Sequence, residues 1–199
     1  QSSWSAGSGV YKRPDATTPA PVGGPIGVRI NEWMAAPADG GDWVELFNPS
    51  ALPVDLTGLF LSDDLVKWDK DPFPPLKFIG ANSFLQLMAD DRLAKRADYL
   101  GFKLNRPGES IVLSAPSGIL LDAVTFGWQT TDVSEGRYPN GATVVISFPG
   151  EATPGEVNRP ATPADADHDG LPDEWETWFG FDPTNPTDAT LDTDTDGLD

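Results

Sequence analysis

The sequence predicts an all-β chain, an antiparallel β-sandwich followed by a small acidic appendage that contains a calcium loop and a short helix. Three observations carry this prediction. Gly and Pro contribute 20 residues each to a chain of 199, a density typical of many short strands joined by turns. Short apolar runs recur between residues 28 and 148 without a helical period between them. Residues 161–199 carry twelve of the 31 acidic residues and none of the 13 Lys and Arg.

The first segment, residues 1–27, is rich in Ser, Gly, Pro and Thr, and we expect it to form a flexible N-terminal arm. The rest of the chain holds enough apolar residues for a packed core, since hydrophobic residues make up 39% of the sequence. Cys is absent, which excludes disulfides and thiolate metal sites. No apolar run approaches the ~20 residues of a membrane span, so membrane insertion is not expected.

The strands are expected in short runs rich in β-branched and aromatic residues, separated by turn signals. The runs are 28–34, 42–48, 58–63, 76–79, 83–89, 110–115, 119–126 and 142–148. The turn Pro116-Ser117-Gly118 between two of these runs is the clearest hairpin. One short helix is plausible over residues 91–97. So many strands in about 120 residues favour an antiparallel sandwich.

Residues 165–176 match the calcium loop D-x-D-x-D-G-x₅-E at every specified position. Calcium takes six to eight hard oxygens, and carboxylates at alternate positions around a glycine hinge converge to supply them. The expected ligands are the side chains of Asp165, Asp167, Asp169, Asp173 and Glu176, and the main-chain carbonyl of Leu171. Asp173 acts directly or through water. Glu176 closes the shell from the first turn of a helix.

The sequence also predicts where that helix begins and ends. Pro172 suits its first position and Gly180 suits its end. Trp175, Trp178 and Phe179 fall at i, i+3 and i+4, which gives an apolar stripe. We expect this stripe to pack on the sandwich or on the segment that follows.

The loop departs from an ordinary EF-hand. Pro172 at position 8 cannot donate the backbone hydrogen bond that pairs two EF loops, and the Pro-rich residues before Asp165 cannot form an entering helix. A second acidic string follows at residues 192–199. Residues 165–199 thus resemble the thrombospondin type 3-like calcium repeats of bacterial secreted proteins. The second loop lacks its later ligands, so Asp192, Asp194 and Asp196 bind loosely or complete a neighbouring site.

No catalytic constellation is visible, and the chain is not expected to be an enzyme. His168 is the only histidine and stands at a variable loop position, where we expect it to face solvent. There is no cysteine nucleophile and no phosphate-binding Gly motif. Glu32 and Glu45 are a formal pair for glycoside hydrolysis, but nothing in the sequence places them in one open cleft.

Between residues 28 and 158 the sequence resembles lamin tail domains, particularly the bacterial extracellular type. The matching segments are 28–34, 42–49, 53–64, 102–104, 108–113, 118–127, 135–141 and 152–158. The resemblance implies an immunoglobulin-like fold and a non-catalytic interaction or anchoring module. Most matching residues have structural explanations. We expect Trp33 and Trp43 to fill the core between the sheets, and Arg137 to pair with a carboxylate such as Glu45.

The predicted division is an arm at 1–27, a sandwich at 28–158, a linker at 159–164 and calcium repeats at 165–199. Net charge is −18, which disfavours nucleic acid and anionic membranes as partners. The chain stops within an acidic motif, so we expect a non-catalytic fragment of a larger secreted or cell-surface bacterial protein. Calcium is its expected ligand, and a protein or a polysaccharide at the cell surface its expected partner. The alternative is a carbohydrate-binding module of an extracellular enzyme, with Trp68 or Trp128 stacking on sugar rings.

Overall fold

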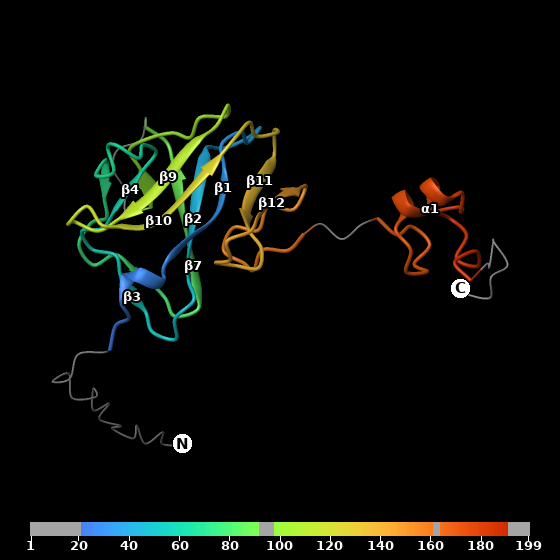
Figure 1. The fold of residues 1–199 in the computed structure, drawn as a ribbon, viewed down its shortest axis with the longest axis horizontal. Coiled ribbons are helices and arrows are strands. Elements are labelled where there is room, and N and C mark those ends of the chain that lie inside the picture. Colours follow the sequence, from blue (N-terminus) through green and yellow to red (C-terminus); the bar gives the residue numbers. More distant parts are fainter. Residues whose placement is uncertain (1–20, 92–97, 161–163, 191–199) are drawn as a thin grey trace, which may run out of the picture.

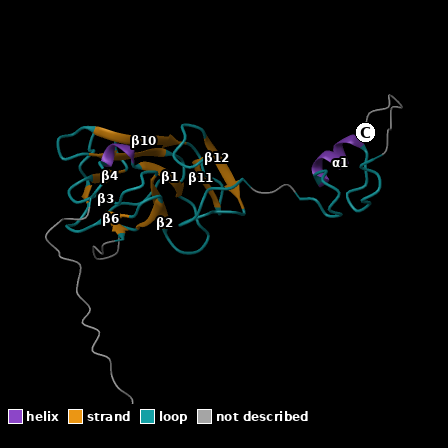
Figure 2. Ribbon diagram, turned by 90° about the horizontal axis from the view of Figure 1, so that it is seen from below, coloured by secondary structure: helices purple, strands orange, loops and turns teal. Residues whose placement is uncertain are grey.

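The computed structural model describes residues 21–91, 98–160 and 164–190, and these residues contain strands and loops almost throughout (Figures 1 and 2). The predicted all-β class is confirmed. Helical structure among them is limited to a 3₁₀ turn, η1 (Pro25–Gly27), and one α-helix, α1 (Asp173–Phe179). Neither is long and apolar enough to cross a membrane. The short helix expected over residues 91–97 lies almost entirely outside the described residues.

The strands form two main sheets and one small one. The larger sheet has the order β12 (Val145–Pro149), β11 (Val133–Arg137), β1 (Arg29–Met34), β2 (Asp42–Asn48), β7 (Ser83–Ala89) and β8 (Tyr99–Leu100). The second has the order β10 (Leu120–Phe126), β9 (Glu109–Ser114), β4 (Phe60–Ser62) and β5 (Asp71–Pro72). The small sheet pairs β3 (Val54–Asp55) with β6 (Phe78–Ile79). Neighbours pair antiparallel, as predicted, except β7 and β8, which are parallel.

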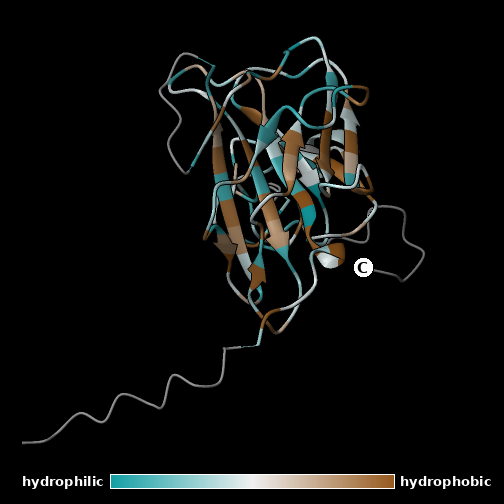
Figure 3. Cartoon of the chain, turned by 90° about the vertical axis from the view of Figure 1, so that its left-hand side faces the viewer, coloured by the Kyte–Doolittle hydropathy of each residue, from teal (hydrophilic) through white to brown (hydrophobic). Residues whose placement is uncertain are grey.

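The core lies between the two main sheets, as in a β-sandwich. One cluster of buried residues joins Ile30, Val44 and Leu87 of the larger sheet to Leu61, Ile111, Val124 and other residues of the second. The Trp33 ring lies 6.1 Å from that of Phe126 across this core. Figure 3 shows hydrophobic and hydrophilic residues following one another along the strands, as expected for sheets with one buried face.

Trp33 fills the core as predicted, but the prediction for Trp43 is wrong. Trp43 is buried at 6% exposure, yet it does not belong to the core cluster. Successive strand residues point to opposite faces, and on β2 Val44 and Leu46 take the core face. Trp43 and Glu45 therefore share the other face of the larger sheet.

Each of the eight predicted runs overlaps a strand, and the Pro116-Ser117-Gly118 hairpin joins β9 to β10 as predicted. Gly118 has φ of +79° in this turn and its N–H donates to the Ala115 carbonyl at 2.9 Å. Strands β3, β5, β8 and β11 were not predicted. Residues 21–27, which the composition assigns to the arm, contact the sandwich, since the Gly23 N–H donates to the Pro53 carbonyl at 2.8 Å.

Candidate metal centre

The acidic loop before α1 turns back on itself, and its own backbone holds the turn. The Asp165 carboxylate accepts the N–H groups of Asp169 and Gly170, each at 3.2 Å. Asp169 in turn accepts the N–H of Leu171 at 2.8 Å. Gly170 has φ of +99°, a conformation in which a side chain is strained. The sequence D-x-D-x-D-G therefore folds locally into a curl that brings alternate carboxylates together.

Helix α1 follows the loop directly. Pro172 has an extended ψ of 138° and stands at the N-cap, whereas the sequence predicted it at the first helical position, which Asp173 occupies. Gly180 ends the helix in the left-handed region with φ of +84°, as predicted. The next N–H, that of Phe181, donates to the Glu176 carbonyl at 2.8 Å. This left-handed turn sends the following residues back alongside the helix.

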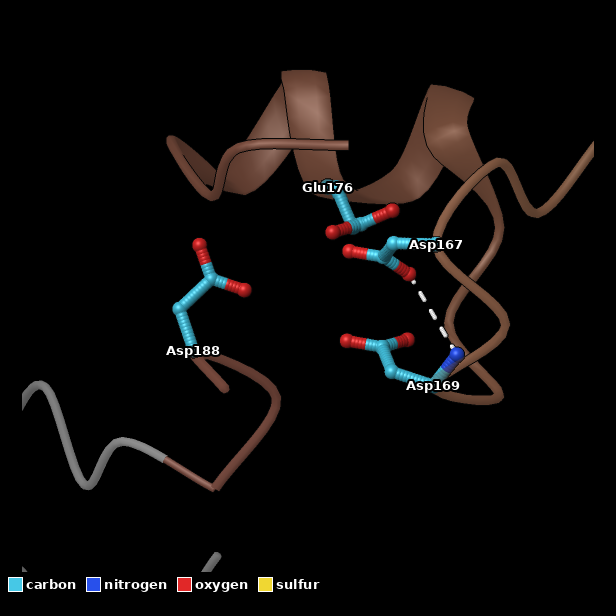
Figure 4. Close-up of side chains that lie close together, drawn as sticks. All are labelled: Asp167, Asp169, Glu176 and Asp188. Atoms are coloured by element: carbon cyan, nitrogen blue, oxygen red, sulfur yellow. Dashed lines mark hydrogen bonds between the residues drawn. The ribbon is translucent and has the colours of Figure 1, made fainter. Parts of the chain in front are cut away.

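Four carboxylates from three segments meet beside α1 (Figure 4). Asp167 and Asp169 come from the loop, Glu176 from the helix, and Asp188 from the segment after it. One oxygen of each can be chosen so that all four lie within 4.8 Å of one another. Oxygens on opposite sides of a calcium ion are about 5 Å apart, twice the Ca–O distance of ~2.3–2.6 Å. The spread of the cluster therefore fits calcium.

Five oxygens of this cluster are buried without a hydrogen-bond donor. They are both oxygens of Glu176 and one Oδ atom each of Asp167, Asp169 and Asp188. Glu176 is fully buried and Asp188 is only 6% exposed. A buried carboxylate with no partner is costly unless a cation or a donor compensates it. Since residues 161–199 contain no Lys or Arg, this unit offers no cation of its own.

The mutual repulsion is visible in the acid–base properties of the cluster. Removal from water raises the pKa of Glu176 to about 7, and the charges of Asp167, Asp169 and Asp188 add to the rise. The pKa of Asp167 is raised for the same two reasons, loss of water first and the Asp169 charge next. A bound dication would reverse both effects because it favours the ionised forms.

The structure brings together three of the nine predicted ligands, Asp167, Asp169 and Glu176. Asp165 and Leu171 line the curl without joining the four-residue cluster. Asp173 also stands outside it, and one of its oxygens accepts the Ala166 N–H at 2.7 Å. The remaining three, Asp192, Asp194 and Asp196, lie outside the described residues. His168 is exposed, as predicted.

Asp188 was missed by reasoning from the loop motif, because it lies twelve residues beyond the closing Glu176. One signal was available. Between Asp182 and Asp192 it is the only acidic residue, and it follows the turn-forming Asn185-Pro186. An isolated acid after a chain-reversing turn is a candidate to return to the preceding site.

A second pair of buried carboxylates lies in the sandwich. Glu32 of β1 and Glu45 of β2 are directly paired across the strands, and both are fully buried. Glu32 accepts the Ser134 hydroxyl at 2.6 Å, the Thr153 N–H at 3.1 Å and the Thr153 hydroxyl at 2.9 Å. Each of its oxygens thus has a donor, and neither glutamate faces an open cleft.

Glu45 is bonded in the same way. It accepts the side-chain amide of Asn31 at 3.2 Å and the N–H of Gly155. Burial raises the pKa of Glu45 to about 7, and the neighbouring Glu32 adds a smaller rise. Residues 153–158 therefore cover this face of the larger sheet. Asn158, 1% exposed, fixes their far end by donating to the Arg137 carbonyl at 2.9 Å.

Arg137 pairs with a carboxylate as predicted, but the partner is Asp122 rather than Glu45. Its guanidinium bonds the Asp122 carboxylate of β10 at 2.9 Å, and its Nε donates to the Ile30 carbonyl at 2.8 Å. Arg137 thus ties the second sheet to the larger one, while the donors of residues 31 and 155 already occupy Glu45.

Comparison with protein families agrees with this architecture. Residues 23–128 match the lamin tail domain, which is just over half of the chain. The chain belongs to the lamin tail domain family. The immunoglobulin-like β-sandwich predicted from the resemblance is therefore confirmed. The family is a structural one, without catalytic residues to carry over. No curated protein matches the chain.

The β-sandwich continues beyond the residues that match the lamin tail domain. β11 lies after residue 128 in the sequence, yet it is an internal strand between β12 and β1. The covering segment 153–158 also follows the match, and it supplies donors to both buried glutamates. These later residues complete the sheet and its outer face.

The two tryptophans considered for sugar stacking differ in their surroundings. Trp68 is half-buried, with its ring edge-on to Phe60 at 5.6 Å. Trp128 is 65% exposed, and the Arg106 guanidinium lies 4.9 Å from its ring centre. The lamin tail domain thus presents one of these rings to solvent rather than two.

Proposed function

We propose that this chain is a calcium-binding, non-catalytic module in which the lamin tail domain supplies an interaction or anchoring surface. Residues 165–188 bind one calcium ion. The observation that carries the proposal is the set of five buried carboxylate oxygens that converge without a donor. The paired glutamates of the sandwich show that this chain provides donors where a buried carboxylate is purely structural.

The chemistry of the ligands selects calcium among common cations. Magnesium is usually held by one or two carboxylates and keeps several waters, whereas four carboxylates meet here. Zinc favours Cys and His, but Cys is absent and His168 is exposed. Calcium accepts six to eight oxygens in flexible geometry. Beyond the five unpartnered oxygens, the Leu171 carbonyl, Asp165 and water are available to complete its shell.

The same site is compatible with an extracellular location, which is part of the proposal. Calcium modules outside cells work at dissociation constants of about 10⁻⁴–10⁻³ M. The resemblance of residues 165–199 to thrombospondin type 3-like repeats of bacterial secreted proteins supports this reading. The partner of the sandwich is then a protein or a polysaccharide at a cell surface.

Isothermal titration calorimetry on the whole 199-residue chain tests the calcium site. We expect one ion per chain, with magnesium binding at least tenfold more weakly. Glu176→Gln preserves the shape of the side chain but removes its charge, and we expect calcium affinity to fall at least 30-fold. Glu156→Gln is the matched control, because that exposed carboxylate pairs only with Arg159. The proposal fails if millimolar calcium gives no heat, or if Glu176→Gln binds as the wild type does.

A further inference from the structure

The segment after α1 contributes to the cluster through one residue, Asp188, whose two oxygens lie in different surroundings. Its Oδ2 accepts the N–H of Asp182 at 2.9 Å and so closes the turn formed by residues 182–188. Its Oδ1 is buried without a partner, and the carboxylate lies with those of Asp169 and Glu176 (Figure 4). Asp188 therefore belongs at once to a local turn and to the cation site.

The other contacts between this segment and the helix are few. Phe181 donates its N–H to the Glu176 carbonyl at 2.8 Å, and its ring stacks on Trp175 with centroids 5.5 Å apart. Trp175 also lies 4.5 Å from Phe179. Trp178 remains 84% exposed, so the aromatic stripe of the helix is only partly covered. A helix of seven residues is not stable in water by itself.

Repulsion between carboxylates also opposes the docking of residues 181–188 onto α1. Docking the segment places the Asp188 carboxylate beside those of Asp167, Asp169 and Glu176, with no Lys or Arg in the sequence between positions 161 and 199. Like charges at this distance repel, and the repulsion is strong where water is excluded. A dication at the centre changes the sign of the interaction, because each carboxylate is then attracted to the ion.

We infer that Asp188 is a calcium ligand from outside the loop, and that it makes ion binding and docking of residues 181–188 onto α1 a single event. The inference rests on the proposed calcium site and adds the regulation of that site. Calcium binding is coupled to folding wherever the ligands come from segments that the free chain does not hold together. The ion here joins three such segments, the loop, the helix and the returning turn.

Hydrogen exchange on the whole chain, with calcium and with chelator, tests this coupling. The amides of residues 181, 182, 184, 185 and 188 are hydrogen-bonded in the docked turn and serve as reporters. We expect calcium to slow their exchange at least tenfold, together with exchange in residues 165–176. In Asp188→Asn the remaining carbonyl oxygen still accepts the Asp182 N–H, but the charged ligand is lost.

For Asp188→Asn we expect at least tenfold weaker calcium binding. At saturating calcium, residues 165–176 become protected while residues 181–188 do not. Asp182→Asn is the matched control, since it makes the same charge change within the same turn and can still accept the bonds from Thr184. It should bind within about twofold of the wild type.

Two results overturn the inference, and they are distinguishable. If the wild type binds calcium but Asp188→Asn keeps its affinity and the protection of residues 181–188, the calcium site stands and the coupling is wrong. If the wild type shows neither calcium-dependent heat nor protection, the calcium site itself is wrong and the coupling falls with it.

Discussion

The molecule contains two groups of buried carboxylates, and their surroundings are opposite. In the sandwich, Glu32 and Glu45 are fully buried, and hydroxyl, amide and backbone N–H donors of the protein meet their oxygens. In the acidic unit, Glu176 and Asp188 are as deeply buried, but three of their four oxygens have no donor. Burial of an acid therefore does not by itself indicate a metal site. The informative observation is whether each buried carboxylate oxygen has a hydrogen-bond donor.

The difference follows from what each region has to offer. The sandwich brings together residues far apart in sequence, so Thr153 and Gly155 can donate to strands β1 and β2. The acidic unit is short and contains no Lys or Arg. Its carboxylates can be compensated only from outside. The lamin tail domain is thus complete without an ion, whereas we expect the acidic unit to be complete only with one.

The largest effect on the free energy of unfolding should come from disrupting the hydrogen-bonded glutamates of the sandwich. Glu32→Ala leaves the Ser134 hydroxyl and the Thr153 N–H buried without this acceptor, and it opens a cavity. The Thr153 hydroxyl keeps only its longer bond to Asn158 Oδ1, at 3.3 Å. Disrupting such a buried network by removing one member costs about 3–5 kcal/mol of unfolding free energy. Urea unfolding in chelator, followed by tryptophan fluorescence, measures it.

Gln86→Ala is the control for that substitution, because Gln86 lies on β7 opposite Glu45 and is exposed. Its unfolding free energy should stay within about 0.5 kcal/mol of the wild type. An equally small change in Glu32→Ala would mean that the bonds around Glu32 contribute nothing to stability, and that the two carboxylate groups do not differ in the way described.

A smaller change in the stability of the sandwich should appear when the pH is changed. Burial raises the pKa of Glu45 to about 7 from a usual value of 4.5, so the folded chain binds a proton more readily than the unfolded chain between these values. The stability of the sandwich should therefore be highest near pH 4.5, fall as pH rises through 7, and level off above. The shift predicts a loss on the order of 3 kcal/mol.

The variant Glu45→Gln isolates the contribution of this residue to the pH dependence from that of other acids. The pKa values of Glu109 and Glu135 are also raised by burial, so the variant should reduce the pH dependence rather than abolish it. The measurement is the urea midpoint between pH 5 and pH 8 in chelator. An undiminished slope in Glu45→Gln would show that the carboxylate is not the source, even though it lies beside Glu32.

Sequence patterns predicted the strands that lie in apolar runs bounded by turns, and missed those that do not. β11 (VSEGR) contains a glycine and two charged residues, yet it pairs on both sides within the larger sheet. Gly136 explains the composition. A Cβ at this position would lie 2.6 Å from the Asn31 carbonyl oxygen and 2.8 Å from the Asn158 amide. The close approach is a property of the assembled sheet, which a local pattern cannot express.

The sequence predicted those ligands of the candidate site that lie close together along the chain. Asp167, Asp169 and Glu176 follow from spacing, because one loop and the helix turn after it place them together. Asp188 depends on the chain reversal after Gly180 and on the turn that returns it. The same limit explains the wrong partner for Arg137, which is set by packing between sheets.

The smallest expected effect concerns an acid that belongs to the predicted loop but not to the four-residue cluster. Asp173 begins α1, and one of its oxygens accepts the Ala166 N–H at 2.7 Å. Asp173→Asn keeps an acceptor for that bond, so it removes negative charge near the ion without removing a ligand. We expect calcium to bind about two- to fivefold more weakly, a change of roughly 0.4–1 kcal/mol. Calorimetry compares it with Asp167→Asn, which removes a clustered ligand and should cost at least 30-fold. Equal losses in the two variants would place Asp173 in the coordination shell, and membership of the four-residue cluster would then no longer separate the metal ligands from the other acids of the loop.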